Sequence, residues 1–193
     1  MIEARSTIQR VVDCLSYAPH YLKRASEQSD PLERLKLTIA TTMSAIYMCT
    51  SQLKPFNPIL GETLQCHFED GSQIFAEHIS HHPPITSLLY EGPDEAYKYY
   101  GSIEFTASLG ANHLKAGQEG NQYIYFKEYD HKIRFTCPKY TLGGTVVGDR
   151  TVNIDHSFEF IDETFGYKAV IIFNPIMKSG GIFSADTYAG TTD

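Results

Sequence analysis

The sequence predicts a mainly β protein of the α+β class, in which an N-terminal helical pair precedes a large antiparallel, incomplete β-barrel. Three observations support this prediction. Apolar side chains recur at helical spacing in the first fifty residues. Many short runs of strand-forming residues follow from about residue 60, separated by Gly, Asn and Asp turns. The aromatic residues, 12% of the chain, are all Tyr and Phe, which strands favour.

Capping signals define the start of each predicted helix. Ser6 is a suitable N-cap, and Gln9 stands three positions later, as in a capping box. We expect this first helix to run to about residue 27. Asp30 is a second N-cap, Pro31 suits the first helical position, and Glu33 can reach back to the cap. We expect the second helix to end near residue 49.

Strands joined by short turns are predicted for the rest of the chain. Asp70 and Gly71 form a turn signal that joins the first two strands in a hairpin. The expected strands are 63–68, 73–79, 86–90, 97–108, 123–128, 132–137, 151–161 and 168–173. Many strands at short spacing are typical of a meandering sheet or barrel. We found no repeat or linker, and therefore expect a single domain over 1–193, with a helical lead-in at 1–52 and the barrel portion at 53–193.

Composition excludes several classes of function. The chain has 193 residues, 42% of them hydrophobic, which suffices for one sizeable core. Its net charge of −7 argues against binding nucleic acid, but leaves room for a small basic pocket that holds one anionic ligand. The four cysteines have no metal-ligand spacing, so we expect reduced thiols in a cytoplasmic protein. We expect neither a signal peptide nor a membrane span. The cysteines are Cys14, Cys49, Cys66 and Cys137.

The stretch LKPFNPILGETL, residues 53–64, is the first of two that carry chemistry. Pro55 and Pro58 fix two φ angles and push Lys54 and Asn57 towards extended conformations. Gly61 allows a turn. The stretch is therefore either a stiff loop that presents one cation and one amide to a ligand, or only a well-made connection between helix and sheet.

The second stretch is EHISHHPPI, residues 77–85, which offers three imidazoles beside two prolines. A helical metal site is disfavoured because His82 precedes Pro83, and no second cluster supplies further ligands. A catalytic histidine would need a nucleophile, and no G-x-S-x-G motif occurs. On a strand, His81 and His82 would point to opposite faces unless the chain bends there. Anion binding remains, because adjacent imidazoles and a lysine can donate several hydrogen bonds to phosphate. Surface or satisfied core histidines are the alternative.

The two stretches together resemble the oxysterol-binding protein family. KPFNPILGET (54–63) and EHISHHPP (77–84) stand in the family's order, and the second is similar to its signature E-Q-x-S-H-H-P-P, with His78 where Gln is usual. The helical lead-in and the final GYKAVIIFNP also resemble the family. The resemblance implies a partial lipid-binding domain, a short form without the family's N-terminal lid and C-terminal helical part.

What the resemblance implies is a non-enzymatic lipid carrier. Lys54, His81 and His82 would contact the phosphate of phosphatidylinositol 4-phosphate, and Asn57 would hold the inositol ring or a phosphate. A sterol or phosphatidylserine would be the second lipid. The chain would need no metal or cofactor, act as a monomer, and touch membrane surfaces transiently. A lipid sensor that binds without transfer, and a histidine-dependent hydrolase, are the alternatives.

Overall fold

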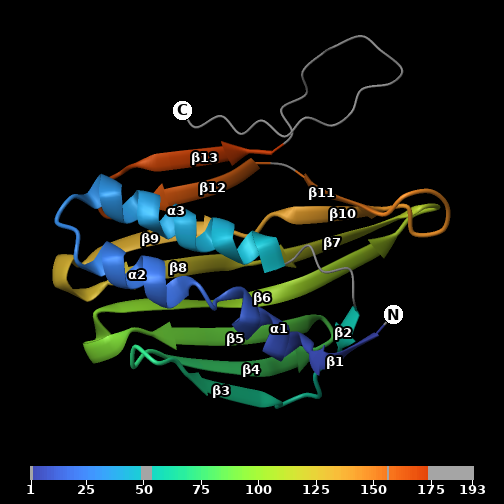
Figure 1. Ribbon diagram of the computed structural model, residues 1–193, viewed down its shortest axis with the longest axis horizontal. Helices are drawn as coiled ribbons and strands as arrows, with labels where there is room; N and C mark the ends of the chain where they lie inside the picture. The colour runs from blue at the N-terminus through green and yellow to red at the C-terminus, as the bar shows by residue number, and fades with distance from the viewer. Residues whose placement is uncertain (1, 49–53, 156, 174–193) are drawn as a thin grey trace, which may run out of the picture.

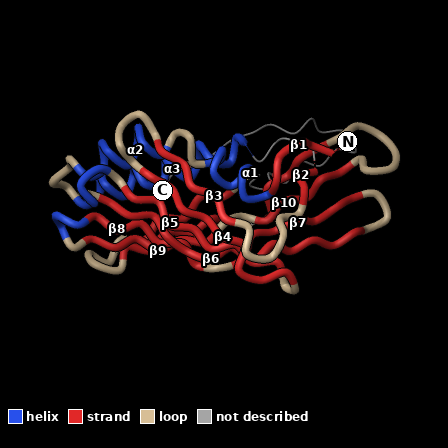
Figure 2. Tube along the Cα trace, turned by 90° about the horizontal axis from the view of Figure 1, so that it is seen from below, coloured by secondary structure: helices blue, strands red, loops and turns tan. Residues whose placement is uncertain are grey.

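The computed structural model describes residues 2–48, 54–155 and 157–173. Its three α-helices lie across one face of a curved antiparallel sheet (Figures 1 and 2). The helices are α1 (Thr7–Cys14), α2 (Ala18–Ser26) and α3 (Pro31–Met48). No helix among these residues is long and apolar enough to cross a membrane.

The main sheet contains eleven strands, and every pairing within it is antiparallel. A separate parallel pair joins β1 (Ile2–Ser6) to β2 (Lys54–Phe56). Short 3-10 turns, η1 (Pro93–Glu95) and η2 (Lys127–Tyr129), connect two pairs of strands. The strands of the main sheet are β3 (Thr63–His67), β4 (Gln73–His81), β5 (Pro84–Glu91), β6 (Tyr97–Leu109), β7 (His113–Glu119), β8 (Asn121–Phe126), β9 (His131–Thr136), β10 (Lys139–Gly143), β11 (Thr151–Asp155), β12 (Ser157–Asp162) and β13 (Lys168–Ile172).

The sheet divides at β6, its longest strand. One edge of β6 pairs with β5, which continues through β4 to β3. The other edge pairs with β8 over its first half and with β7 over its second half. From there one branch runs β7–β10–β11 and the other runs β8–β9–β12–β13. Among the described residues no pairing closes the sheet, so the predicted fold, a mainly β protein with an incomplete antiparallel barrel, is confirmed.

The core lies between the helices and the sheet. Each helix buries one apolar stripe, for example Ile8 of α1, Leu22 of α2 and Leu35 of α3. Strand β4 alternates between buried and exposed positions, as expected for a strand that faces a core on one side. The aromatic part of the core comes from β5, β6, β8, β9 and β12, and its fully buried members are Tyr90, Tyr97, Phe126, Phe135, Phe158 and Phe160.

The helical lead-in differs in detail from the prediction. The capping box at Ser6 and Gln9 is confirmed, with both reciprocal hydrogen bonds present. The single helix expected up to residue 27 is wrong, because α1 ends at Cys14 and α2 begins at Ala18. Pro19 lies in the first turn of α2, where its missing N–H is tolerated, whereas it would interrupt a continuous helix. The prediction also missed strand β1.

The strand predictions need two corrections. The single strand expected over 151–161 is two strands, since β11 pairs with β10 whereas β12 pairs with β9 and β13. Strands β2, β7 and β10 were not predicted. The other expected strands are present, with ends shifted by a few residues.

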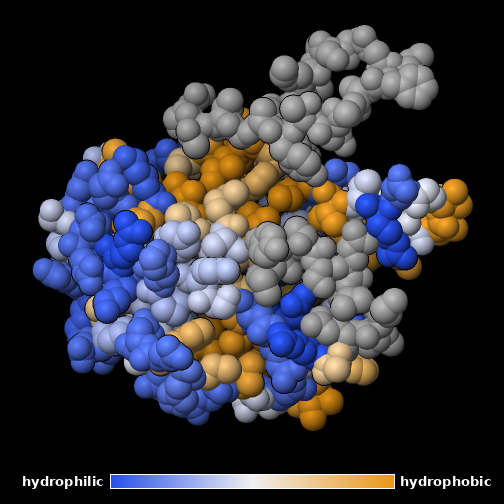
Figure 3. All heavy atoms as spheres, viewed as in Figure 1, coloured by the Kyte–Doolittle hydropathy of each residue, from blue (hydrophilic) through white to orange (hydrophobic). Residues whose placement is uncertain are grey.

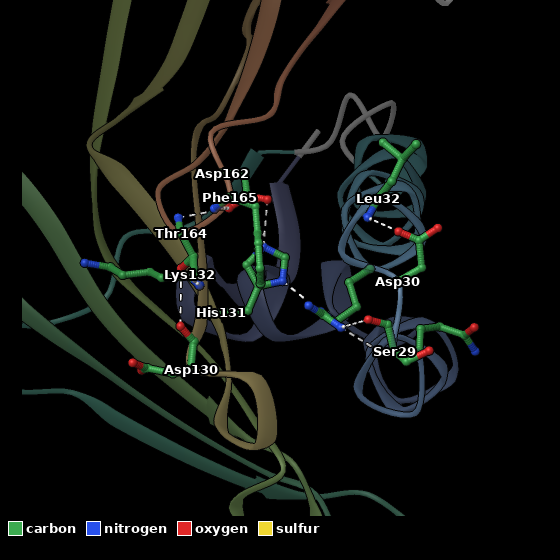
Figure 4. Close-up of polar contacts among 11 residues, drawn as sticks. Ser29, Asp30, Leu32, Asp130, His131, Lys132, Asp162, Thr164 and Phe165 are labelled. Atoms are coloured by element: carbon green, nitrogen blue, oxygen red, sulfur yellow. Dashed lines mark hydrogen bonds and ion pairs between the residues drawn. The ribbon is translucent and has the colours of Figure 1, made fainter.

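A buried polar cluster fixes the α2–α3 connection to the sheet (Figure 4). The Arg34 side chain, 1% exposed, donates from Nε to Nδ1 of His131 at 2.8 Å and from Nη1 to the carbonyl oxygens of Gln28 and Ser29. On the far side of the imidazole, Nε2 lies 2.9 Å from Oδ2 of Asp162, in electrostatic contact but without the alignment of a regular hydrogen bond. The cluster therefore ties the helical layer to β9 and β12.

Candidate functional site

The first motif begins on the short strand β2. Lys54 and Phe56 pair with the N-terminal segment, Lys54 opposite Ile2 and Phe56 opposite Ser6. The hydroxyl of Thr7 donates to the carbonyl oxygen of Phe56 at 3.2 Å. Strand β1 therefore holds the start of the motif in place, while the Lys54 side chain is exposed.

The rest of this motif is a loop closed by its own hydrogen bonds. The amide of Ile59 donates to Oε2 of Glu62, and the amide of Glu62 donates to the carbonyl of Ile59. Gly61 adopts a φ of 79°, in the left-handed region that favours glycine. Pro58 is buried whereas Asn57 is exposed. The loop thus has a defined backbone and presents Asn57 to solvent.

The second motif forms the sharp turn between β4 and β5. Strand β4 ends at His81 and β5 begins at Pro84, so that His82 and Pro83, joined by a cis peptide bond, form the turn. The rings of His81 and His82 lie 4.9 Å apart, edge to face, and both residues are exposed. A regular strand would have directed the two rings to opposite faces. The bend brings them together instead.

His78 joins the two motifs. Its amide donates to the carbonyl of Glu62, and its carbonyl accepts from the amide of Gly61, both at 2.9 Å. Its side chain, 1% exposed, lies between two partners: Nδ1 is 3.3 Å from the hydroxyl of Thr86, and Nε2 is 3.3 Å from Nδ1 of His81. The first motif is therefore docked on the strand that carries the paired histidines.

Burial favours the neutral form of the His78 ring. Desolvation lowers the pKa of His78, and the neighbouring His81 lowers it further. A neutral imidazole has one donor and one acceptor, which suits a ring held between a hydroxyl and another imidazole. His78 therefore positions His81. Lys54 supplies positive charge for an anion at this end, and the two exposed rings supply hydrogen-bond donors.

An apolar cavity lies between the helices and the sheet. Its volume is about 50 Å³, and its lining comes from α1, α3, β5, β6, β7, β10 and the connections that follow α1 and β9. The side chains around it include Val11, Ile46, Leu88, Tyr99 and Ile103. Among the described residues, no group of three or more His, Cys, Asp or Glu could hold a metal ion.

Comparison with known proteins identifies the family. The family model described as oxysterol-binding protein matches residues 1–189. The chain belongs to the oxysterol-binding protein family. It is 39% identical over 175 residues to oxysterol-binding protein 9 of Dictyostelium discoideum, covering 91% of this chain and 41% of that one. It is 29% identical to the human oxysterol-binding protein-related protein 2, covering 90% of this chain and 36% of that one.

Solved structures show the same fold. The ORD of Osh3 from Saccharomyces cerevisiae, in complex with PI(4)P, matches with a TM-score of 0.83 at 24% identity, over 99% of this chain and 50% of that chain. The Osh1 ORD in complex with cholesterol matches with a TM-score of 0.82, over 89% of this chain and 42% of that chain. The chain spans less than half the length of these curated relatives and at most half of these solved chains.

In this member of the oxysterol-binding protein family, the structure places the four expected site residues in two groups. His81 and His82 are adjacent, whereas Lys54 and Asn57 are exposed on the first motif, whose contacts with His78 are made by Gly61 and Glu62 instead. The role of His78 was missed, although a signal existed. Its even spacing from the apolar Ile74 and Ala76 on one strand predicts an inward-facing side chain.

Proposed function

We propose that the chain is a non-enzymatic lipid-binding and lipid-transfer protein, which binds the headgroup of phosphatidylinositol 4-phosphate at the joined motifs. The observation that carries this proposal is the docking of the first motif on His78, because it joins a loop bearing Lys54 and Asn57 to the turn that bears the histidine pair. His81 and His82 donate hydrogen bonds to the phosphate, Lys54 supplies charge, and Asn57 contacts the inositol ring.

Two solved relatives support the lipid class. The Osh3 ORD was solved with PI(4)P, and the Osh1 ORD was solved with cholesterol and with ergosterol. We therefore propose a sterol as the second lipid, with phosphatidylserine as the other option. The place proposed for the protein is the cytoplasm, with transient contact at membrane surfaces.

The apolar cavity supports a place for the lipid's apolar part, between the helices and the sheet. Its volume of about 50 Å³ is well below the roughly 300–1,000 Å³ of usual small-molecule pockets. Uptake of a sterol or acyl chain therefore requires that α1 or α3 shift away from the sheet. Burial of the apolar part stabilises the complex by roughly 25 cal/mol per Å².

Titration with a water-soluble, short-chain phosphatidylinositol 4-phosphate tests the headgroup site. Lys54→Ala, and the double variant His81→Ala with His82→Ala, should each weaken binding at least about tenfold, since each removes charge-assisted hydrogen bonds. The matched control is His20→Ala with His67→Ala, which removes two exposed histidines outside the motifs. Wild-type affinity in the double His81/His82 variant would refute the proposal.

Transfer and binding are separable by a second assay. Fluorescent phosphatidylinositol 4-phosphate or sterol, moved from donor to acceptor liposomes by catalytic amounts of protein, establishes a carrier. Binding without movement establishes a sensor. Release of a hydrolysed lipid would favour an enzyme that uses His81 or His82 as a base, and would contradict the proposed function.

A further inference from the structure

The most exposed apolar side chains gather at one end of the sheet. Among the described residues, five large apolar side chains are between 66% and 85% exposed. Two of them, Ile59 and Leu60, lie in the loop of the first motif. The other three, Leu109, Val146 and Val147, lie at the β6–β7 turn and in the β10–β11 loop, and are named the apolar tip below. In Figure 3, hydrophobic atoms mark this end at the right.

Strand register explains why these segments share an end. Ile85, the residue after Pro84, pairs with Glu104, so the second half of β6 runs past the histidine turn towards Leu109. Gly143 pairs with His113 directly after the β6–β7 turn, which places the β10–β11 loop beside it. The candidate headgroup site and the apolar tip therefore lie at the same end of the molecule (Figure 1).

The side chain of Asn112 fixes the tip. Its Oδ1 accepts hydrogen bonds from the amides of Val146 and Val147, both at 2.9 Å, and its Nδ2 donates to the carbonyl of Val147 at 2.8 Å. The amide of Thr145 donates to the Asn112 carbonyl. Two turns distant in sequence are thus held as one unit. Val146 and Val147 are therefore exposed on a backbone that is already fixed. Little conformational entropy is lost when they bind a partner.

The two ends of the molecule differ in charge. The connections at the far end, 27–30, 68–72, 92–96, 127–130 and 163–167, contain nine acidic residues and one basic residue. The connections at the site end, 54–62, 82–83, 110–112 and 144–150, contain two acidic and two basic residues. In Figure 3 the far end, at the left, is correspondingly hydrophilic. An anionic surface repels the far end and thereby orients the site end towards itself.

We propose that the apolar tip docks the chain on an anionic phospholipid bilayer, with Leu109, Val146 and Val147 inserted among the lipid headgroups. The tip lies outside the headgroup motifs, and it brings the candidate headgroup site to the bilayer surface. Peripheral proteins bind membranes by inserting exposed apolar side chains from a surface that the lipid headgroups do not repel. The apolar tip has such side chains, and its end of the molecule carries no excess of negative charge. The docking role rests on the proposed lipid function, which requires contact with membranes.

Vesicle flotation of the 193-residue chain tests the docking directly. The vesicles contain phosphatidylcholine and phosphatidylglycerol only, neither of which is a lipid proposed for the binding site, so that flotation does not depend on that site. Val146→Asp with Val147→Asp should lower partitioning at least about tenfold, because two apolar side chains are replaced by charges that the bilayer repels. The control, Leu32→Asp with Tyr167→Asp, adds the same charge at the far end and should change partitioning less than about twofold.

A fluorescence reporter supplies a second readout. The chain contains no Trp, so Val147→Trp introduces a single Trp at the tip, whose emission can be separated from that of the tyrosines by selective excitation. Its emission should shift to the blue on adding these vesicles, whereas Tyr167→Trp at the far end should not change.

Each outcome bears on one proposal. Wild-type flotation of the Val146/Val147 variant, an equal loss in the control, or no flotation of the wild type would overturn the docking. Loss of flotation in that variant with unchanged affinity for short-chain phosphatidylinositol 4-phosphate would support it. If the wild type fails to bind the short-chain lipid while the tip still controls flotation, the headgroup proposal fails and the docking stands.

Discussion

The replacement Asp162→Asn should destabilise the fold, because no arrangement of protons can satisfy the cluster that results. Arg34 always carries its proton and donates to Nδ1 of His131, so the neutral ring holds its proton on Nε2, facing Asp162. Oδ1 of Asp162 accepts from the amides of Thr164 and Phe165. An Asn that keeps those two bonds turns an amide N–H towards Nε2–H. If the Asn amide flips, the amides of Thr164 and Phe165 lose their acceptor. If His131 instead carries its proton on Nδ1, that N–H faces the Nε–H donor of Arg34.

The magnitude follows from burial. Arg34, His131 and Asp162 are each at most 2% exposed. An unsatisfied buried donor costs about 1–3 kcal/mol, and removing the carboxylate also leaves the buried charge of Arg34 uncompensated, for which about 3–5 kcal/mol is the upper bound set by a directly broken buried ion pair. Because Asp162→Asn removes the charge but keeps the volume, we expect a loss of roughly 2–4 kcal/mol in the free energy of unfolding. For a domain of this size that lowers Tm by roughly 5–15 °C.

Urea and thermal unfolding, followed by circular dichroism, measure this loss. The matched control is Asp94→Asn, at an exposed position with a φ of 54° that Asn tolerates. It should remain within about 0.5 kcal/mol of the wild type. A change of that small size for Asp162→Asn would refute the reasoning. It would mean that the cluster has a satisfied arrangement with a neutral group at residue 162.

Three further predictions concern protonation, the site and the helix cap. Burial lowers the pKa of His78 and of His131 below that of an unfolded histidine, about 6.5, so the unfolded state binds more protons in acid. The free energy of unfolding should have its full value above about pH 7. As the pH decreases through about 6.5, it should fall by up to about 1.4 kcal/mol per pH unit for each ring. Urea midpoints that do not change with pH would contradict this. At the site, His78→Gln should keep the affinity for short-chain phosphatidylinositol 4-phosphate within about threefold. His78→Leu offers no hydrogen-bonding group to His81 and should weaken the affinity about tenfold. Equal affinities of the Gln and Leu variants in a titration would show that His78 does not position His81. Ser6→Ala should cost about 1 kcal/mol in thermal unfolding by removing the cap of α1, and an unchanged Tm would show that the cap contributes nothing.

Local signals in the sequence predicted the elements whose conformation is set locally. The Ser6–Gln9 capping box and the Asp70–Gly71 hairpin turn are in this class, since each depends on neighbours within a few residues. Strands β7 and β10 were missed because their sequences, HLKAGQE and KYTLG, contain Gly and Lys and lack clean alternation. They are strands because β6 and β11 pair with them, a tertiary effect that no short window contains.

The candidate site divides in the same way. Both motifs could be identified from the sequence, because each is defined by proline or histidine residues within a short stretch. It did not predict how the motifs are joined, since the bonds come from the backbone of Gly61, Glu62 and His78. The pairing of His81 and His82 depends on the bend at the turn, which is an exception to the regular strand geometry that would separate the two rings.

The distribution of strong contacts along α3 indicates which part of the helical layer can open for a lipid. Its N-terminal end is anchored by Arg34, whose hydrogen bonds reach both the α2–α3 connection and β9. Its later part lines the small apolar cavity with Thr42, Ala45 and Ile46, opposite Val11 of α1. Opening at the anchored end would break the charged cluster, at the several kcal/mol estimated for Asp162→Asn, whereas opening at the cavity separates mainly apolar surfaces that a lipid can cover again. Lipid entry is therefore expected between α1 and the later half of α3, while the hydrogen bonds of Arg34 keep the N-terminal end of α3 attached to the sheet.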